Sequence, residues 1–164
     1  MRAKKQDHLK LRGYLEYVLT DARTGKVVKR GKTHNTVTAW GRGWALNQLS
    51  PASNSQVITA IAIGSNSATA PSSNQTALVS YMTIANIGTT GLTSATNTAC
   101  TFYGAVSFNT NQTWTNSSQI GEFALYNSSA TNNASAVMFN RVTTSSYINF
   151  ATSNTLAISI SITN

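Results

Sequence analysis

The chain has 164 residues, of which 41% are hydrophobic and only 10% are charged. This length is sufficient for a single domain with a buried core. Its one cysteine, Cys100, excludes an internal disulfide, and the two histidines, His8 and His34, lie too far from it in sequence for a zinc module. No run of about 18 apolar residues exists, and the N-terminus is basic without a following apolar stretch, so neither a membrane span nor a signal peptide is predicted.

The net charge of +8 belongs to the first quarter of the chain. After Arg42 the only charged residues are Glu122 and Arg141, so residues 43–164 sum to zero and are instead rich in Ser, Thr and Asn. An ordinary soluble domain keeps about a quarter of its residues charged. Because low charge allows surfaces to associate, this composition favours a component of an assembly over a freely diffusing enzyme.

Residues 1–9 are predicted to form a basic arm, and residues 10–34 an antiparallel hairpin. Leu15, Tyr17 and Leu19 alternate with more polar residues, which is the period of a strand with one apolar face. The segment DARTGK, residues 21–26, has the composition of a turn, with Gly25 available for a positive φ. Leu15, Tyr17 and Leu19 could complete a sheet edge.

Residues 36–50 are predicted to form a helix of about three turns. Its apolar residues fall near helical spacing, Thr36 or Thr38 can cap its start, and Pro51 ends it. Gly41 and Gly43 weaken this helix, each by about 1 kcal/mol relative to Ala. They indicate a close backbone contact, although a helix that starts only at Arg42 would also explain them.

Residues 56–164 carry a β pattern throughout. The predicted strands are Val57–Ile63, Tyr81–Ile87, Cys100–Phe108, Ile120–Tyr126, Ala136–Thr143, Ser146–Phe150 and a final strand from Leu156 to Thr163. The final strand is the clearest, because Leu156, Ile158 and Ile160 alternate strictly with small or polar residues. Cys100 is expected in the core as a small hydrophobic residue, and chemically inert. The predicted fold class is therefore mainly β: one domain over residues 1–164, an antiparallel β-sandwich or barrel-like sheet with an N-terminal hairpin and one short helix.

Few residues could support catalysis, so no enzyme activity, cofactor or metal is predicted. Glu122 has no carboxylate neighbour in sequence for a glycosidase pair, and the chain has neither a G-x-S-x-G elbow nor a phosphate-binding loop. Glu122 and Arg141 could form an ion pair between strands or across a subunit contact. Two separate exposed charges are the simpler interpretation, because surface pairs are weak.

The basic N-terminal quarter is predicted to dock an acidic protein partner. The candidate docking residues are Arg2, Lys4, Lys5, Lys10, Arg12, Lys26, Lys29, Arg30 and Lys32. A merely solvated hairpin face is the alternative. Clustered cations also attract phosphates, but direct nucleic-acid binding is not expected, because the sequence has neither an aromatic RNA-binding motif nor a zinc finger.

The order of elements resembles small virion structural proteins of tailed bacteriophages. The similarity covers YVLTDARTGKVVKRGKTHNTVTAWGRGWALNQL, then ITAIAIGSNSATAPSSNQTAL, IGEFALYNSS, AVMFNRV and the closing LAISISI. In that group a TGKV…NT…GR opening is followed by a similar strand and loop, although the scarcity of charge after Arg42 departs from the usual form. The resemblance implies localisation in the virion and binding to other virion proteins and to copies of itself, with no membrane.

Within that group, a capsid-attached decoration or cement protein is the leading expectation, and a tail, neck or fibre-base protein is the alternative. A carbohydrate-binding β-sandwich module is a second alternative. Its best single feature is Trp114 in the polar segment NTNQTWTNSSQ, although a tryptophan that anchors a loop on the sheet is the simpler interpretation.

Overall fold

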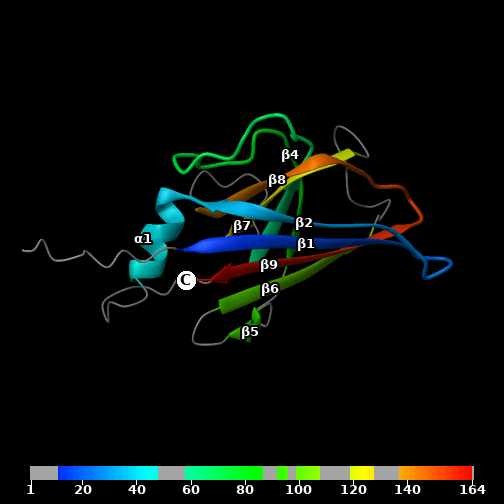
Figure 1. The fold of residues 1–164 in the computed structure, drawn as a ribbon, viewed down its shortest axis with the longest axis horizontal. Coiled ribbons are helices and arrows are strands. Elements are labelled where there is room, and N and C mark those ends of the chain that lie inside the picture. The colour runs from blue at the N-terminus through cyan, green and yellow to red at the C-terminus, as the bar shows by residue number, and fades with distance from the viewer. Residues whose placement is uncertain are drawn as a thin grey trace, which may run out of the picture.

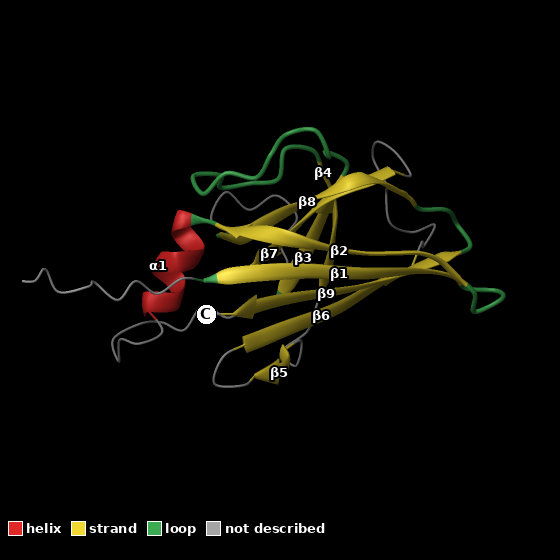
Figure 2. Cartoon of the chain, viewed as in Figure 1, coloured by secondary structure: helices red, strands yellow, loops and turns green. Residues whose placement is uncertain are grey.

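The computed structural model describes residues 11–47, 58–86, 92–95, 99–107, 119–127 and 137–163. Strands dominate these residues, accompanied by one helix (Figures 1 and 2). The elements are β1 (Arg12–Asp21), β2 (Val27–Val37), α1 (Ala39–Asn47), β3 (Ala60–Gly64), β4 (Tyr81–Asn86), β5 (Leu92–Ala95), β6 (Ala99–Ser107), β7 (Gln119–Tyr126), β8 (Met138–Asn149) and β9 (Asn154–Thr163). The predicted class, mainly β with an N-terminal hairpin and a short helix, is confirmed.

All the described strands belong to one antiparallel sheet of nine strands, in the order β4-β3-β7-β8-β2-β1-β9-β6-β5. β2 joins its two halves: residues 27–35 pair along β1, whereas only Thr36 and Val37 pair with β8. The sheet therefore curls at β2, and the half that contains β1, β9 and β6 lies in front of the half that contains β3 and β7 (Figure 1). β1 is an inner strand, held by β2 on one side and β9 on the other, and not part of a sheet edge.

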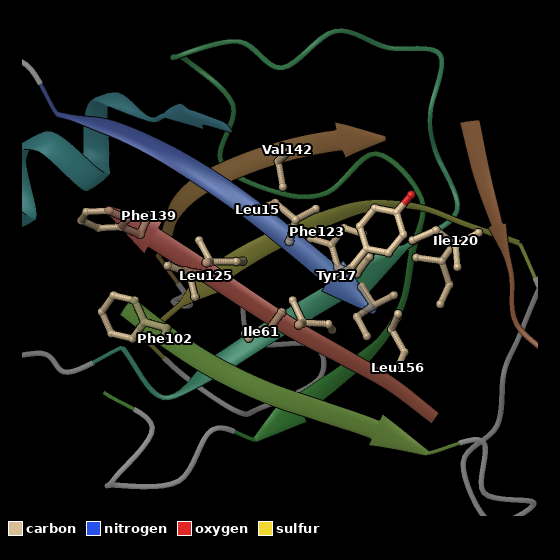
Figure 3. Packing of buried hydrophobic residues seen from close by; sticks show 14 of the residues in the cluster. Leu15, Tyr17, Ile61, Phe102, Ile120, Phe123, Leu125, Phe139, Val142 and Leu156 are labelled. Carbon is tan, nitrogen blue, oxygen red and sulfur yellow. The ribbon is translucent and has the colours of Figure 1, made fainter. Parts of the chain in front are cut away.

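The main core lies between the two halves. Leu15, Tyr17 and Leu19 of β1 are buried, as the period of two predicts, and every second residue of β9 from Asn154 to Ile162 is buried as well. Figure 3 shows Leu15 and Tyr17 in one cluster with Phe123 of β7, between strands that cross. Each fully buried side chain of this size stabilises the fold by about 1.5 to 3 kcal/mol.

A second, smaller cluster lies on the other face of β3 and β7. It is covered by residues 65–80, the loop between β3 and β4, which we call the strap; in Figure 2 it runs along the top of the molecule. The cluster contains Ala60, Ala62, Leu78, Ala124, Tyr126 and Met138. β7 is therefore buried on both faces, from Ile120 to Tyr126.

Helix α1 begins at a strong N-cap. The Thr38 hydroxyl accepts a hydrogen bond from Gly41 N at 2.9 Å and itself donates to the carbonyl of Met138 at 2.7 Å. A Cβ at Gly41 would overlap the carbonyl oxygen of Phe139, so this glycine lets the helix backbone approach β8, as one of the two interpretations predicted. Trp44 packs edge-on against the Phe139 ring, with the ring centroids 5.2 Å apart.

Some boundaries differ from the prediction. The two strands predicted over residues 136–150 form one strand, β8. Its pairing with β7 is interrupted by a bulge: Ile120 pairs with Ile148 but Glu122 with Thr143, and the exposed residues 145–147 lie in the extra stretch of β8. β5 was not predicted, and β3 starts at residue 60 rather than 57. The helix starts at residue 39 rather than 36.

Cys100 differs from the prediction too. Its side chain is a free thiol that packs against the rim of the core and is only partly buried. The predicted contact with the core is therefore present, but the predicted burial is only partial, and the chemical inertness of Cys100 stays a prediction. The basic arm of residues 1–9 and Trp114 lie outside the described residues.

Candidate functional site

The turn of the β1–β2 hairpin is a rigid cationic tip. One Asp21 carboxylate oxygen accepts hydrogen bonds from the backbone N–H groups of Arg23 and Thr24, at 3.0 and 2.9 Å, and from the Thr24 hydroxyl. The bonds from Thr24, first from its backbone and then from its hydroxyl, lower the pKa of Asp21. Gly25 adopts a φ of 70° and closes the turn. Asp21 stays ionised and offsets one positive charge, so the exposed Arg23 and Lys26 leave the tip with a net positive charge.

Alternation along β1 and β2 places a second group of basic residues on the outer face of the sheet. Arg12, Arg30, Lys32 and His34 are exposed there, on the opposite face from Leu15 and the core. We call this group, together with the half-buried Tyr14, the basic face. It has one carboxylate, Glu16, which accepts a hydrogen bond from the Lys32 ammonium and thereby raises the pKa of Lys32. The ring of Tyr14 lies 4.7 Å from that of His34 and 5.2 Å from the Lys32 nitrogen.

The structure therefore divides the predicted docking residues. Arg12, Arg30 and Lys32 share the basic face, whereas Lys26 is at the tip. Lys29 points the other way: its ammonium donates to the hydroxyl of Ser146 and the carbonyl of Tyr147, at 3.0 and 2.8 Å. Lys29 bridges the gap where β2 and β8 diverge, so it is not part of the basic face. Arg2, Lys4, Lys5 and Lys10 lie outside the described residues.

Glu122 and Arg141 form a fully buried ion pair, each 0% exposed. Arg141 Nε and Nη2 each lie 2.7 Å from Glu122 Oε2. Nη1 donates to the carbonyl of Thr69 and the amide oxygen of Gln75, both at 3.0 Å, and Nη2 also donates to Asn66 at 3.3 Å. A guanidinium has five N–H donors. Arg141 makes four hydrogen bonds with them and, through Nη2, a further close ion-pair contact with Glu122.

The carboxylate completes the connection to the strap. Glu122 Oε1 accepts from Ser80 N at 2.7 Å, and Oε2 accepts from Val79 N at 3.2 Å. Gly64 lies opposite Glu122 in the neighbouring strand, and a Cβ there would overlap the carboxylate. The ion pair thus anchors the strap to the sheet at five residues.

The expectation of two separate exposed charges was wrong, and the alternative of an ion pair between neighbouring strands is what the structure contains. β7 and β8 are adjacent, and Arg141 pairs in register with Ala124, two residues from Glu122. A signal was present in the sequence: Glu122 is embedded in IGEFALY and Arg141 in VMFNRV. Strands that are apolar on both faces are buried on both faces, so a charge within them must find a partner.

This burial has a consequence for the whole surface. Glu122 and Arg141 are the only charged residues after Arg42, and both are inside. Residues 43–164 therefore contribute no charged side chain to the exterior. The surface is split between a basic N-terminal segment and a neutral remainder that is rich in hydroxyl and amide groups.

The described residues hold no group of three or more His, Cys, Asp or Glu arranged for a metal ion. Cys100 is on the core side of its strand and His34 on the outer face, so the two cannot act as a nucleophile and base. Within the same residues, no helix has the length and apolar character needed to cross a membrane.

Comparison of the chain with protein-family models, curated proteins and solved structures gave no match.

Proposed function

We propose that the chain is a non-enzymatic structural protein of a tailed-bacteriophage virion, most simply a capsid-attached decoration or cement protein. The observation that carries the proposal is the division of the surface into a basic segment and a neutral remainder. A surface without charged side chains has little electrostatic repulsion to oppose contact with a neighbour, which suits a protein that packs in many copies. The sequence pattern that resembles virion proteins supports the same role.

In this role the cationic tip and the basic arm of residues 1–9 would dock on an acidic surface of the particle. Arg23 and Lys26 are exposed beside Val27 and Val28, which are 49% and 58% exposed. The turn is held by Asp21, so docking would cost little ordering of the backbone. Cations that surround an apolar contact provide both attraction at a distance and a surface to bury.

The test is the composition and architecture of purified phage particles from the source of the chain. Mass spectrometry should find the chain at a fixed ratio to the major capsid protein. Electron microscopy should then place its curled sheet on the capsid lattice. A tail, neck or fibre-base position would retain the virion role and change only the site. The proposal is overturned if the chain is present in infected cells but missing from purified particles.

A separate experiment tests the docking segment. Deletion of residues 1–9 should leave the thermal stability nearly unchanged and weaken binding to particles that lack the chain. The loss should shrink as the salt concentration rises, because exposed charges are screened beyond about 8 Å at physiological ionic strength. Binding that ignores both the deletion and the salt concentration contradicts electrostatic docking.

A further inference from the structure

The basic face has a linear arrangement that the tip lacks. Arg30, Lys32 and His34 are alternate residues of β2, so they point outwards about 7 Å apart. Arg12 continues the line on β1, because Gly13 pairs with Asn35 and Arg12 therefore lies just beyond His34. The result is a row of basic side chains on the outer face of β2 and β1.

Among the described residues, few acidic side chains neutralise this row of basic residues. Arg12 and Arg30 make no ion pair with any described residue. Lys32 is bound to Glu16, but both side chains are more than half exposed, and exposed pairs of this kind are weak. An arriving anion can therefore recruit Lys32 as well.

Aromatic and hydroxyl side chains lie beside this row of basic residues, on the same face of the sheet. Tyr14 is the immediate neighbour of His34, and Ser161 and Thr101 follow on the next two strands. Tyr103, 48% exposed, lies in the adjacent row of the same face. Aromatic rings on a sheet next to a row of cations are the combination on which bases stack while phosphates bind the cations.

We propose that the outer face of β2 and β1 binds a single-stranded nucleic acid. Its phosphates would follow Arg30, Lys32, His34 and Arg12, and its bases would lie over Tyr14. A row at a regular spacing fits a linear polyanion better than an acidic protein surface, where carboxylates are scattered in two dimensions. Among the described residues this face is built from strands of the sheet, and it presents no helix to the groove of a duplex. This inference goes beyond the virion role and does not depend on it.

The test is fluorescence anisotropy of a labelled oligothymidylate with the full chain over a range of salt concentrations. For wild type, log Kd should vary linearly with log salt. The variant Arg30→Gln/Lys32→Gln should bind more weakly and lower the magnitude of the salt slope by about 1.4, because two phosphate contacts to a single strand are lost. Tyr14→Leu should weaken binding about five- to tenfold and leave the slope unchanged, since stacking releases no counterions.

The matched control is Arg23→Gln/Lys26→Gln, which removes the same charge from the tip. It should retain the wild-type slope and nearly the wild-type affinity, and circular dichroism should show that all variants are folded. The inference is overturned if both double variants weaken binding equally, because net charge alone would then explain it. It is also overturned if poly-glutamate competes or binds in place of the oligonucleotide, which would identify the face as a protein-docking surface. Absence of oligothymidylate binding from a chain that is present in particles would overturn this inference and leave the virion role intact.

Discussion

At the scale of single residues, the buried ion pair is the most demanding feature of the molecule. Removing two charges from water costs several kcal/mol per ion, and the cost is recovered only if their hydrogen-bonding groups find partners. Here Arg141 donates four hydrogen bonds and contacts Glu122 through Nη2 as well, and the Glu122 carboxylate receives two backbone N–H groups besides the guanidinium. The pair therefore gives the strap a defined position more than it adds net stability.

Loss of one partner should consequently be severe. Arg141→Met leaves Glu122 buried without its counterion, and we expect the free energy of unfolding to fall by about 3 to 5 kcal/mol. Urea denaturation measures this fall, and hydrogen exchange should show faster exchange at the amides of Val79 and Ser80. The double variant Arg141→Met/Glu122→Gln should lose less than the sum of the single variants.

The exposed pair provides the control for that experiment. Glu16→Gln removes the partner of Lys32 and should change the free energy of unfolding by less than about 1 kcal/mol. If Arg141→Met costs no more than Glu16→Gln, the ion pair does not anchor the strap.

Tyr126 provides a prediction of pH dependence. Burial raises the pKa of Tyr126 from 10.0 to about 12, while its hydroxyl accepts a hydrogen bond from Leu78 N. Above pH 10 the unfolded chain releases this phenolic proton and the folded chain retains it, so stability should fall as the pH rises through this range. Tyr126→Phe should make the alkaline decline shallower in unfolding experiments across pH 9 to 12. Burial also raises the pKa values of Tyr17 and Tyr81, so part of the decline should remain.

At the scale of elements, helix α1 contains a matched pair of glycines. Gly41 lies against the backbone of β8, whereas a Cβ at Gly43 would have no neighbour within 4 Å. Ala is the better helix former by about 1 kcal/mol, so Gly43→Ala should stabilise the protein by up to that amount. Gly41→Ala should destabilise it by about 1 to 3 kcal/mol, because the helix must move away from Phe139. Thermal unfolding of the two variants should show shifts of opposite sign; equal shifts would contradict the close packing of α1 on β8.

Elements with a regular period were predictable, and interrupted ones were not. The alternation in β1 and β9 matches their burial because each has one face on the core and one outside. Two strands were predicted in place of β8, because the bulge at Ser145–Tyr147 interrupts the alternation of apolar and polar residues. One face of β7 and β3 packs in the main core, and the strap covers the other. Their apolar character on both faces indicated burial, but it did not indicate which segment of the chain covers them.

The candidate site was predictable to a similar degree. The concentration of cations in the hairpin was evident from the sequence. Their division between the tip and the basic face depends on which face of the strand each residue occupies. The inward position of Lys29 depends in addition on the divergence of β2 from β8. Lys29 also places a charge at the open side of β2, where strands would otherwise be prone to pair with another chain. This placement depends on where β2 leaves β8, which the sequence pattern alone does not indicate.

At the scale of the whole molecule, the neutral exterior should make the protein associate. We expect sedimentation velocity to show self-association that increases with concentration and is insensitive to salt, because no charged side chain lies on that surface. Introducing cations on the strap with Ala70→Lys/Ala77→Lys, at two exposed positions, should reduce it. A strict monomer at high concentration that also binds no capsid or tail protein would contradict the interpretation.

The burial of Arg141 also determines how the native protein responds to trypsin. Trypsin cleaves after Lys and Arg, and the only such residue after Arg42 is shielded by the sheet and the strap. Digestion of the folded protein should therefore be confined to the first 42 residues and leave residues 43–164 as one uncut fragment, and cleavage at Arg141 should appear only after unfolding. Amine-directed cross-linkers face the same restriction, because every lysine precedes Thr33. A proteolytic map of assembled particles would thus report on the first 42 residues alone, and residues 43–164 would escape detection however deeply they are embedded in their neighbours.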